Sequence, residues 1–406
     1  MISYPIISFS IILLALSILV KVEEIQWNQV TKESKIFLDI ITSIPMMIIY
    51  TIPITGAILT FIHILPSRLR LSYIYNIDGE VIKSNMIANS KLPPFLPDPK
   101  FVSKEAYEKI YNSLKKKSES TTNKVDDKAS WALLTGCTRG IGRGIAISLA
   151  RRRVPIVLVS KNEPALVEFS KLIQECYGVP IHTIISDLSK ADAVEKIVKE
   201  LKDKDIAIEF LINNAGVADT REMVEMEMSK IEEICNINML NMTKLTKVLG
   251  VLMKEKQRGR IVFLSSLVGA VPIPMSSVYA ASKAYTRSLA RSIGRELETY
   301  NIACTCIMPG AVAETDFASS SNMKSSLVWK FPIGRLSPQI VAECAVINAI
   351  KGNQEVVVGW LNAALLYIAQ CLLPPRLIMI IGEWSWKPVP SLNIFRKKKN
   401  GSITTE

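Results

Sequence analysis

Histidine is almost absent from this chain, with only His63 and His182 in 406 residues. Histidine is a frequent zinc ligand and the usual base of a serine nucleophile, so a histidine-based metal site and a Ser-His-Asp triad are both disfavoured. We interpret His182 as a surface residue. The sequence also has no zinc-finger spacing and no aromatic RNA-binding box. It therefore predicts neither a metal nor a nucleic-acid partner.

Paired cysteine motifs are missing as well. The chain has seven cysteines, and no two of them form a CxxC pair. An odd, scattered set argues against a disulfide framework and favours a reducing compartment. The cysteines are Cys137, Cys176, Cys235, Cys304, Cys306, Cys344 and Cys371.

Acidic residues are the minority charge, with 37 Asp and Glu against 49 Lys and Arg, for a net charge of +12. A net positive charge suits a protein that binds nucleic acid or an anionic membrane surface. The basic residues flank apolar segments, 49% of the residues are hydrophobic, and the mean hydropathy is +0.25. These features favour the membrane. The length favours one catalytic domain with appended segments.

The first apolar run, Ile6 to Val20, lacks a preceding basic residue and is a poor signal peptide. A longer run spans Ile36 to Leu65. We expect residues 1–65 to form membrane segments, either as a hairpin of two spans or as one span with a cleaved or interfacial leader. Arg68 and Arg70 follow, so the positive-inside rule places the rest of the chain in the cytosol. The expected location is the endoplasmic reticulum membrane.

Residues 66–128 are predicted to be a linker region. Residues 91–100 hold four prolines, and residues 112–128 are polar and charged. The catalytic domain is then expected over residues 129–359, and residues 360–406 form a C-terminal apolar segment with a basic tail. The apolar stretch Leu361–Ile381 is broken at Pro374 and Pro375. It predicts two short interfacial helices or, alternatively, a helix packed on the domain.

Within the catalytic region, short apolar runs alternate with helical patterns. This alternation predicts an α/β fold with a doubly wound parallel sheet of the Rossmann type. Strands are expected at Trp131–Thr135, Ile156–Ser160, His182–Ile185, Phe210–Asn213, Ile261–Ser265, Ala303–Ile307 and Glu355–Gly359. Helices are expected at Ile141–Arg152, Pro164–Cys176, Ala191–Leu201, Met228–Glu255 and Tyr279–Tyr300.

The first strand ends in the glycine-rich segment TGCTRGIG, Thr135 to Gly142. Gly136 permits a tight turn, Gly140 lets the backbone approach a pyrophosphate, and Gly142 permits close packing of helix on strand. The free N–H groups of the following helix face the phosphates. The segment predicts a dinucleotide site.

This segment, with the motifs that follow it, resembles the short-chain dehydrogenase/reductase family from about Ala129 to Gly359. Those motifs are Asp187-Leu188, NNAG at Asn213–Gly216, Asn238, Ser266, YAASK at Tyr279–Lys283, and Pro309-Gly310. The resemblance implies that Asp187 and Leu188 hold the adenine ring and that NNAG lines the adenosine side. The expected cofactor-binding residues are Gly136, Thr138, Arg139, Gly140, Ile141, Gly142, Lys161, Asp187, Leu188, Asn214, Ala215, Gly216, Tyr279, Lys283, Pro309, Gly310 and Thr315.

The charges near the ribose favour NADPH over NADH. An NAD enzyme usually carries an acid after the second strand, whereas this chain has Ser160-Lys161-Asn162. Arg139 adds a second cation inside the glycine loop. Two cations suit a 2′-phosphate through charge-assisted hydrogen bonds.

The resemblance implies a catalytic set of Asn238, Ser266, Tyr279 and Lys283. Tyr279 and Lys283 are four residues apart and share one helix face. The ammonium is expected to lower the pKa of the tyrosine, which then serves as proton donor without any metal. Spacing favours Ser266 over Ser265, and the NxN pattern favours Asn238 over the neighbouring asparagines Asn236 and Asn241.

The segment after Pro309-Gly310 departs from the family pattern by one extra residue before Thr315. Residues 316–336 correspond to the substrate lid of the family. Their apolar residues suggest an apolar substrate or, alternatively, a core-packed helix; they are Met323, Leu327, Val328, Trp329 and Phe331.

The predicted function is reduction of a lipid-like ketone at a membrane, of the 3-oxoacyl-CoA, 3-ketosphingoid or ketosteroid type. The expected partners are a hydrophobic small molecule and membrane lipid, and a homo-oligomer is left open. The alternative is a catalytically silent scaffold that binds NADPH. The complete catalytic set argues against it, because a scaffold does not need all four groups.

Overall fold

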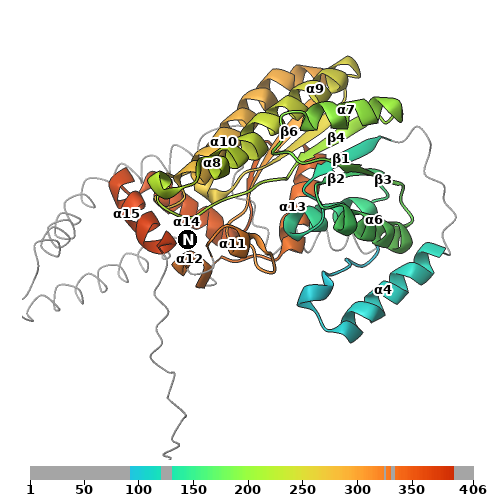
Figure 1. Ribbon diagram of the computed structural model, residues 1–406, viewed down its shortest axis with the longest axis horizontal. Helices are drawn as coiled ribbons and strands as arrows, with labels where there is room; N and C mark the ends of the chain where they lie inside the picture. The colour runs from blue at the N-terminus through green and yellow to red at the C-terminus, as the bar shows by residue number, and fades with distance from the viewer. Residues whose placement is uncertain (1–91, 120–129, 324–325, 331–333, 388–406) are drawn as a thin grey trace, which may run out of the picture. The chain divides into compact units, whose positions relative to one another are not determined.

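The computed structural model describes residues 92–119, 130–323, 326–330 and 334–387 (Figure 1). All of them belong to the second of two compact units, Tyr73–Glu406. The membrane segments predicted within residues 1–65 and the basic tail after residue 387 lie outside the described residues.

Seven parallel strands form one sheet in the order β3-β2-β1-β4-β5-β6-β7. The chain enters at the centre, moves outward to β3, returns to β4 beside β1, and then moves outward in the other direction. This confirms the predicted doubly wound Rossmann-type sheet. The strands are β1 (Trp131–Thr135), β2 (Ile156–Ser160), β3 (Ile181–Ile185), β4 (Ile208–Asn213), β5 (Gly259–Leu264), β6 (Ile302–Met308) and β7 (Glu355–Val357).

Helices cover both faces of the sheet (Figure 1). Alternate side chains of a strand point to opposite faces, so Ala132 and Leu134 of β1 join one apolar cluster and Leu133 joins the other. The central strands read as continuous apolar runs because helices bury both of their faces. The first face is covered by α5 (Gly140–Arg151), α6 (Glu163–Tyr177) and α13 (Pro338–Lys351), and the second by α7 (Ala193–Asp203), α9 (Asn241–Glu255) and α10 (Ser277–Leu297).

The long helix expected over Met228–Glu255 is divided into three parts. Helix α8 (Met228–Cys235) continues into a π-helical turn, η4 (Asn236–Leu240), and then into α9. Such π-turns occur frequently at functional sites, because they rotate a side chain out of the regular helical pattern. Here the turn carries the buried Asn238.

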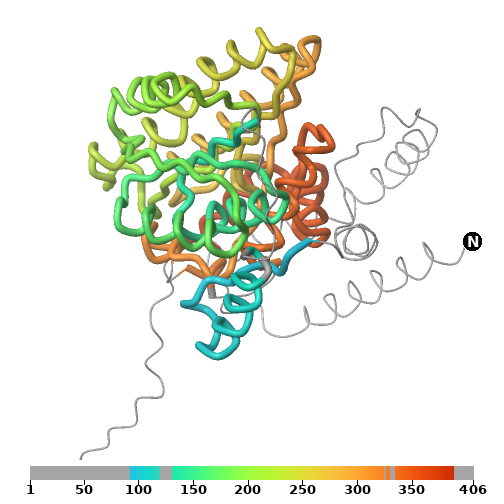
Figure 2. The backbone as a smooth tube through the Cα atoms, turned by 90° about the vertical axis from the view of Figure 1, so that its right-hand side faces the viewer, coloured from blue at the N-terminus to red at the C-terminus, as the bar shows by residue number. Residues whose placement is uncertain are grey.

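The linker prediction was wrong for residues 104–119, which form helix α4 (Lys104–Glu119). Leu114 of this helix is buried, and α4 packs against α6. The preceding segment is also part of the compact body, because Leu96 is fully buried. The composition suggested a linker because this helix is rich in lysine and has few apolar residues. Its amphipathic face was therefore not recognised in the sequence. We call residues 92–119 the N-terminal arm; Figure 2 shows it in blue and cyan against the catalytic body.

The C-terminal apolar segment forms two helices, α14 (Trp360–Cys371) and α15 (Pro375–Trp386), which are interrupted at the predicted prolines. Each packs one side on the catalytic body, burying Leu366 and Trp386, and the Gln370 amide donates to the Ala270 carbonyl at 3.1 Å. Across the described residues, no helix is both long and apolar enough to cross a bilayer.

Candidate active site

The site lies at the carboxyl ends of the central parallel strands, where this kind of sheet places its ligands. The glycine loop follows β1, the NNAG segment follows β4, Ser266 follows β5, and Pro309-Gly310 follows β6. The topology therefore gathers at one edge of the sheet four motifs that are far apart in the sequence.

The glycine loop is packed so closely that side chains are excluded. Gly136 and Gly140 adopt left-handed backbone conformations, with φ of +67° and +56°. A Cβ atom on Gly142 would lie 2.1 Å from the Gly136 carbonyl oxygen. No side chain caps the start of α5, so the N–H groups of its first turn remain available to a ligand. This cradle fits a dinucleotide phosphate.

The NNAG segment holds the glycine loop in place. The Asn214 side-chain amide donates to the carbonyl oxygens of Thr135 and Gly136, at 2.9 Å each. The backbone N–H groups of Asn214 and Ala215 both donate to the Thr135 hydroxyl at 3.1 Å. Thr135 is thus a supporting residue that the motif analysis did not single out, although it stands at the start of the glycine segment.

Asp187 and Leu188 lie after β3, at the expected adenine side. The Asp187 carboxylate accepts from the Ser189 backbone N–H at 3.0 Å. Burial raises the pKa of Asp187, but hydrogen bonds from Ser189 and the nearby Lys161 outweigh it, and the pKa is lowered overall. The Asn241 amide donates to the Leu188 carbonyl at 2.8 Å. Asn241, the sequence alternative to Asn238, therefore holds the segment expected on the adenine side.

The two cations expected on the 2′-phosphate have separate partners in this structure. The Arg139 guanidinium lies 3.8 Å from Asp316, and the Lys161 ammonium lies 3.9 Å from Glu233. Both cationic side chains are more than half exposed, so these ion pairs are weak and easily exchanged.

Tyr279 is buried at the start of α10, where its side chain interacts with that of Ser266. Burial raises the pKa of Tyr279, and the interaction with Ser266 opposes this only in part. The expected lowering of this pKa by Lys283 is not found. In the structure burial dominates, because it penalises the charged tyrosinate. Tyr279 therefore carries its proton at neutral pH, which is the form that a proton donor requires.

Lys283 is buried one turn further along α10. Its ammonium donates to the Leu264 carbonyl at 2.7 Å and lies 5.8 Å from the centre of the Tyr279 ring. Burial lowers the pKa of Lys283 to about 8. A Cβ atom on Gly216 would lie 3.3 Å from this ammonium. The last glycine of NNAG thus leaves the space in which the lysine ends.

Asn238 lies beside the same glycine, with its Oδ1 atom 3.4 Å from the position of a Cβ on Gly216. Its amide accepts from the Val217 N–H and donates to the Val217 carbonyl, both at 2.9 Å, and it also donates to the Ser282 hydroxyl. By contrast, the Asn236 amide donates to the Ser189 carbonyl at 3.2 Å, on the adenine side.

The two neighbouring serines have different surroundings. The Ser265 hydroxyl is buried and donates to the Lys283 backbone carbonyl at 2.8 Å. Ser266 faces Tyr279, and its hydroxyl lies 3.5 Å from the Pro309 carbonyl oxygen. The geometry therefore places Ser266 beside Tyr279 and gives Ser265 a supporting position.

The extra residue before Thr315 is accommodated by backbone conformation. Glu314 adopts a left-handed φ of +53°. Thr315 then lies over the glycine loop, with its methyl carbon 3.3 Å from the position of a Cβ on Gly140.

Asn362 of α14 supports the same edge of the sheet. Its buried amide donates to the carbonyls of Val358 and Gly334, and a Cβ on Gly310 would lie 2.8 Å from it. No motif marks this residue in the sequence, and its contacts extend the catalytic body past the expected boundary at residue 359.

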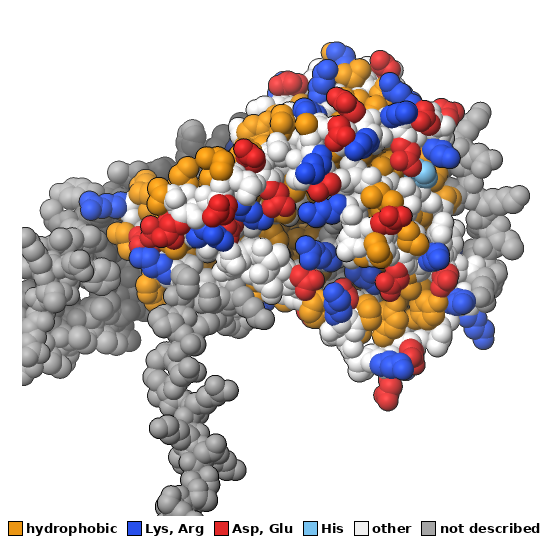
Figure 3. Space-filling model, viewed as in Figure 1, with side chains coloured by type: hydrophobic (Ala, Val, Ile, Leu, Met, Phe, Trp, Pro, Cys, Tyr) orange, Lys and Arg blue, Asp and Glu red, His pale blue; other side chains and the backbone are white. Residues whose placement is uncertain are grey.

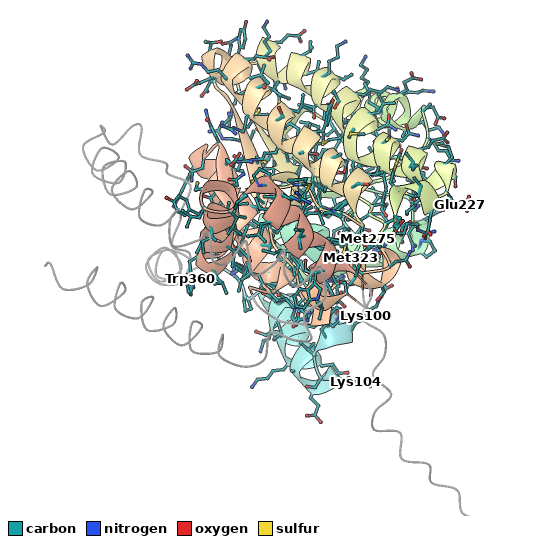
Figure 4. The ribbon with its side chains drawn as sticks, turned by 90° about the vertical axis from the view of Figure 1, so that its left-hand side faces the viewer. Lys100, Lys104, Glu227, Met275, Met323 and Trp360 are labelled. Atoms are coloured by element: carbon teal, nitrogen blue, oxygen red, sulfur yellow. The ribbon has the colours of Figure 1, made fainter. Side chains whose placement is uncertain are left out.

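Apolar side chains surround Tyr279 on the substrate side. Phe317 lies 5.8 Å from Tyr279 between ring centres. Figure 4 shows Met275 and Met323 together in this region. The lid, residues 316–336, and helix α15 both contribute, while the lid residue Phe331 lies outside the described residues. We call this the third cluster; its buried members are Ala218, Ile273, Tyr279, Ala280, Ala318, Met323 and Trp386.

Several known proteins are similar to this chain. The family model described as short chain dehydrogenase matches residues 130–326. The human inactive hydroxysteroid dehydrogenase-like protein 1 is 30% identical over 259 residues, which cover 63% of this chain and 73% of that protein. The mouse very-long-chain 3-oxoacyl-CoA reductase is 29% identical over 276 residues, which cover 66% of this chain and 84% of that enzyme.

Among solved structures, a short-chain dehydrogenase from Sphingobium yanoikuyae in complex with NADPH has a TM-score of 0.52 at 25% identity. The match covers 56% of this chain and 87% of that one. The chain belongs to the short-chain dehydrogenase/reductase family, whose oxidoreductases act on alcohol and ketone groups.

Proposed function

We propose that this chain uses NADPH to reduce a ketone on a hydrophobic, lipid-like substrate at a membrane. One observation carries the proposal: the side chains of Tyr279 and Ser266 lie close enough to interact where the third cluster meets the cofactor edge of the sheet. A proton donor beside the nucleotide site, with apolar surroundings, suits a carbonyl on an apolar molecule.

NADPH, when bound, supplies the hydride. The glycine loop and the start of α5 bind its phosphates, and Arg139 and Lys161 are the cations available to the 2′-phosphate. Ser266 orients the substrate carbonyl, and the Tyr279 hydroxyl gives its proton to the carbonyl oxygen. Lys283 holds the ribose and stabilises the tyrosinate that remains, while Asn238 supports the lysine side of the site. The solved NADPH complex of a relative supports this choice of cofactor.

Ketone reduction should decline above pH 8. The pKa of Lys283 is about 8, so its ammonium is lost as the pH rises through that value, and with it the stabilisation of tyrosinate. The measurement is kcat/KM against pH, which reports groups of the free enzyme. In the Lys283→Arg variant, the remaining activity should show no fall near pH 8. A decline at the same pH in that variant would assign it to another group.

The third cluster should select long apolar substrates. For a series of 3-oxoacyl thioesters, kcat/KM should rise about fourfold per added methylene until the cluster is filled, because each buried methylene contributes about 0.8 kcal/mol. The assay follows NADPH oxidation along the series. A constant value from short to long chains would contradict a lipid-like substrate.

Two tryptophans of α15 provide a matched pair for this series. Trp386 is buried in the third cluster, whereas Trp384 is 68% exposed. Trp386→Ala should weaken the dependence on chain length, and Trp384→Ala should leave it unchanged. Equal effects of the two substitutions would show that the third cluster does not determine the dependence on chain length.

The outer sides of α14 and α15 support contact with lipid. Grouped apolar exposure of this kind is unusual on a protein surface and typical of interfacial helices. Over the face that α7 and α9 form, by comparison, acidic and basic side chains are mixed (Figure 3). The exposed residues are Trp360, Leu365, Tyr367, Ile368, Leu372, Met379, Ile380, Ile381 and Trp384.

We place the catalytic body on the cytosolic side of the endoplasmic reticulum membrane. All seven cysteines are free thiols, which suits a reducing compartment. The cations that follow Leu65 give the same orientation.

A second candidate is NADPH binding without turnover. It draws support from the name of the human relative, which is called inactive. Against it stand the four catalytic residues, all of which this chain carries at one edge of the sheet.

A further inference from the structure

Lys100 of the N-terminal arm lies near the glycine loop. Its ammonium is 3.8 Å from the Asp316 Oδ2 atom, and the Arg139 guanidinium is 3.8 Å from the same oxygen. Asp316 therefore lies between two cations, one from the glycine loop and one from a segment that precedes the first strand. Figure 4 shows Lys100 at the edge of the body, near the arm's helix.

The arm is fixed where it approaches this site. The Tyr177 hydroxyl donates to the Pro94 carbonyl at 2.9 Å and accepts from the N–H of the buried Leu96 at 3.0 Å. The Arg151 guanidinium donates to the Pro93 carbonyl at 2.6 Å. Prolines restrict the unfolded chain, so ordering this segment costs less conformational entropy.

Asp98 fixes the backbone of the arm just before Lys100. One of its carboxylate oxygens accepts from the Lys100 backbone N–H at 3.1 Å and caps the short 3-10 helix η2 (Pro99–Phe101). The other lies 3.9 Å from the Arg143 guanidinium. Arg143 is one turn along α5 from Arg139, so the arm is tied to the helix that carries the glycine loop.

We propose that Lys100 is a phosphate-binding residue of the dinucleotide site, supplied by the N-terminal arm. In this proposal the Asp316 carboxylate occupies the position of the phosphate until the phosphate binds. The inference rests on the proposed NADPH cofactor. A carboxylate that bridges two cations marks a position where an anion is stabilised. A phosphate group carries more charge and more acceptor oxygens than a carboxylate, so it can displace Asp316 from both cations. The side chains of Lys100 and Arg139 are 69% and 65% exposed, which leaves them free to turn toward a ligand.

The test is the dissociation constant of NADPH for the full chain, measured by the change in NADPH fluorescence. Lys100→Ala should weaken binding about fivefold, since one charge-assisted contact is lost. Lys104→Ala is the matched control: Lys104 follows closely on the same arm, is 88% exposed, and pairs only with Glu108 among the described residues. It should change the constant by less than twofold. Asp316→Asn should tighten binding, because the competing carboxylate is removed.

A parallel titration with NADH identifies the phosphate. A loss confined to NADPH assigns Lys100 to the 2′-phosphate, and an equal loss for both cofactors assigns it to the pyrophosphate. Unchanged binding by Lys100→Ala, or weaker binding by Asp316→Asn, would overturn the inference while the proposed function stands. Failure of the unaltered chain to bind NADPH would overturn both.

Discussion

Replacement of Tyr279 by phenylalanine should lower ketone turnover by about a thousandfold, because a positioned general acid contributes factors of that order. NADPH binding should stay within about twofold, since the phenol oxygen is removed and the ring that packs in the third cluster is retained. Steady-state NADPH oxidation with a 3-oxoacyl thioester, together with a fluorescence titration of NADPH, measures both quantities.

Tyr285→Phe is the matched control for this change. Tyr285 lies on the same helix, is 38% exposed, and its hydroxyl is 2.9 Å from the Thr243 hydroxyl. Loss of this hydroxyl should leave turnover unchanged. If Tyr279→Phe retained more than a tenth of the turnover of the unaltered chain, another group would have to be the proton donor.

Gly142→Ala should abolish measurable NADPH binding and destabilise the fold. The new methyl group would lie 2.1 Å from the Gly136 carbonyl oxygen and 2.5 Å from the Asn214 amide nitrogen. Neither atom can move without breaking the bonds that shape the glycine loop, so we expect an overpacking cost of at least about 3 kcal/mol. Thermal unfolding with and without NADPH measures the two effects together.

Gly250→Ala provides the control for Gly142→Ala. Gly250 lies within α9, and a Cβ atom there would meet nothing within 4 Å. Alanine in a helix interior is favoured over glycine by about 0.5–1 kcal/mol, so this variant should be slightly more stable and bind NADPH normally. Normal NADPH binding by Gly142→Ala would contradict the tight packing of the loop.

The sheet and the motif positions were predictable because they depend on local signals. β1 and β2 have the bounds expected from the sequence, since a parallel strand buried on both faces is a continuous apolar run. The glycine loop was predictable because glycine adopts the left-handed conformations of Gly136 and Gly140 without steric cost.

Elements whose stability comes from long-range contacts were not predictable. Helix α4 owes its place to Leu114 and to the surface of α6, which lies far along the chain. Helix α13 is apolar on most of its faces and gives no periodic signal. The π-turn at Asn238, the contacts of Asn362 and the Asp316 bridge between Lys100 and Arg139 likewise depend on partners that only the fold brings together.

The same limit explains the pKa of Tyr279. Sequence spacing placed Lys283 one turn away and suggested a lowered pKa. The depth of burial of Tyr279, which lies within the third cluster and beside Phe317, could not be derived from that spacing.

The central claim, that the chain reduces a ketone with NADPH, is tested most directly by isotope transfer. Full-length protein is incubated with NADPH that carries deuterium at the transferable position and with a long-chain 3-oxoacyl thioester, and the product is examined by mass spectrometry. Deuterium on the new carbinol carbon, formed about a thousandfold more slowly with Tyr279→Phe, is the predicted result. Protein that binds NADPH, yet forms no labelled alcohol from long-chain, sphingoid or steroid ketones, would contradict the reductase and favour a silent NADPH-binding scaffold.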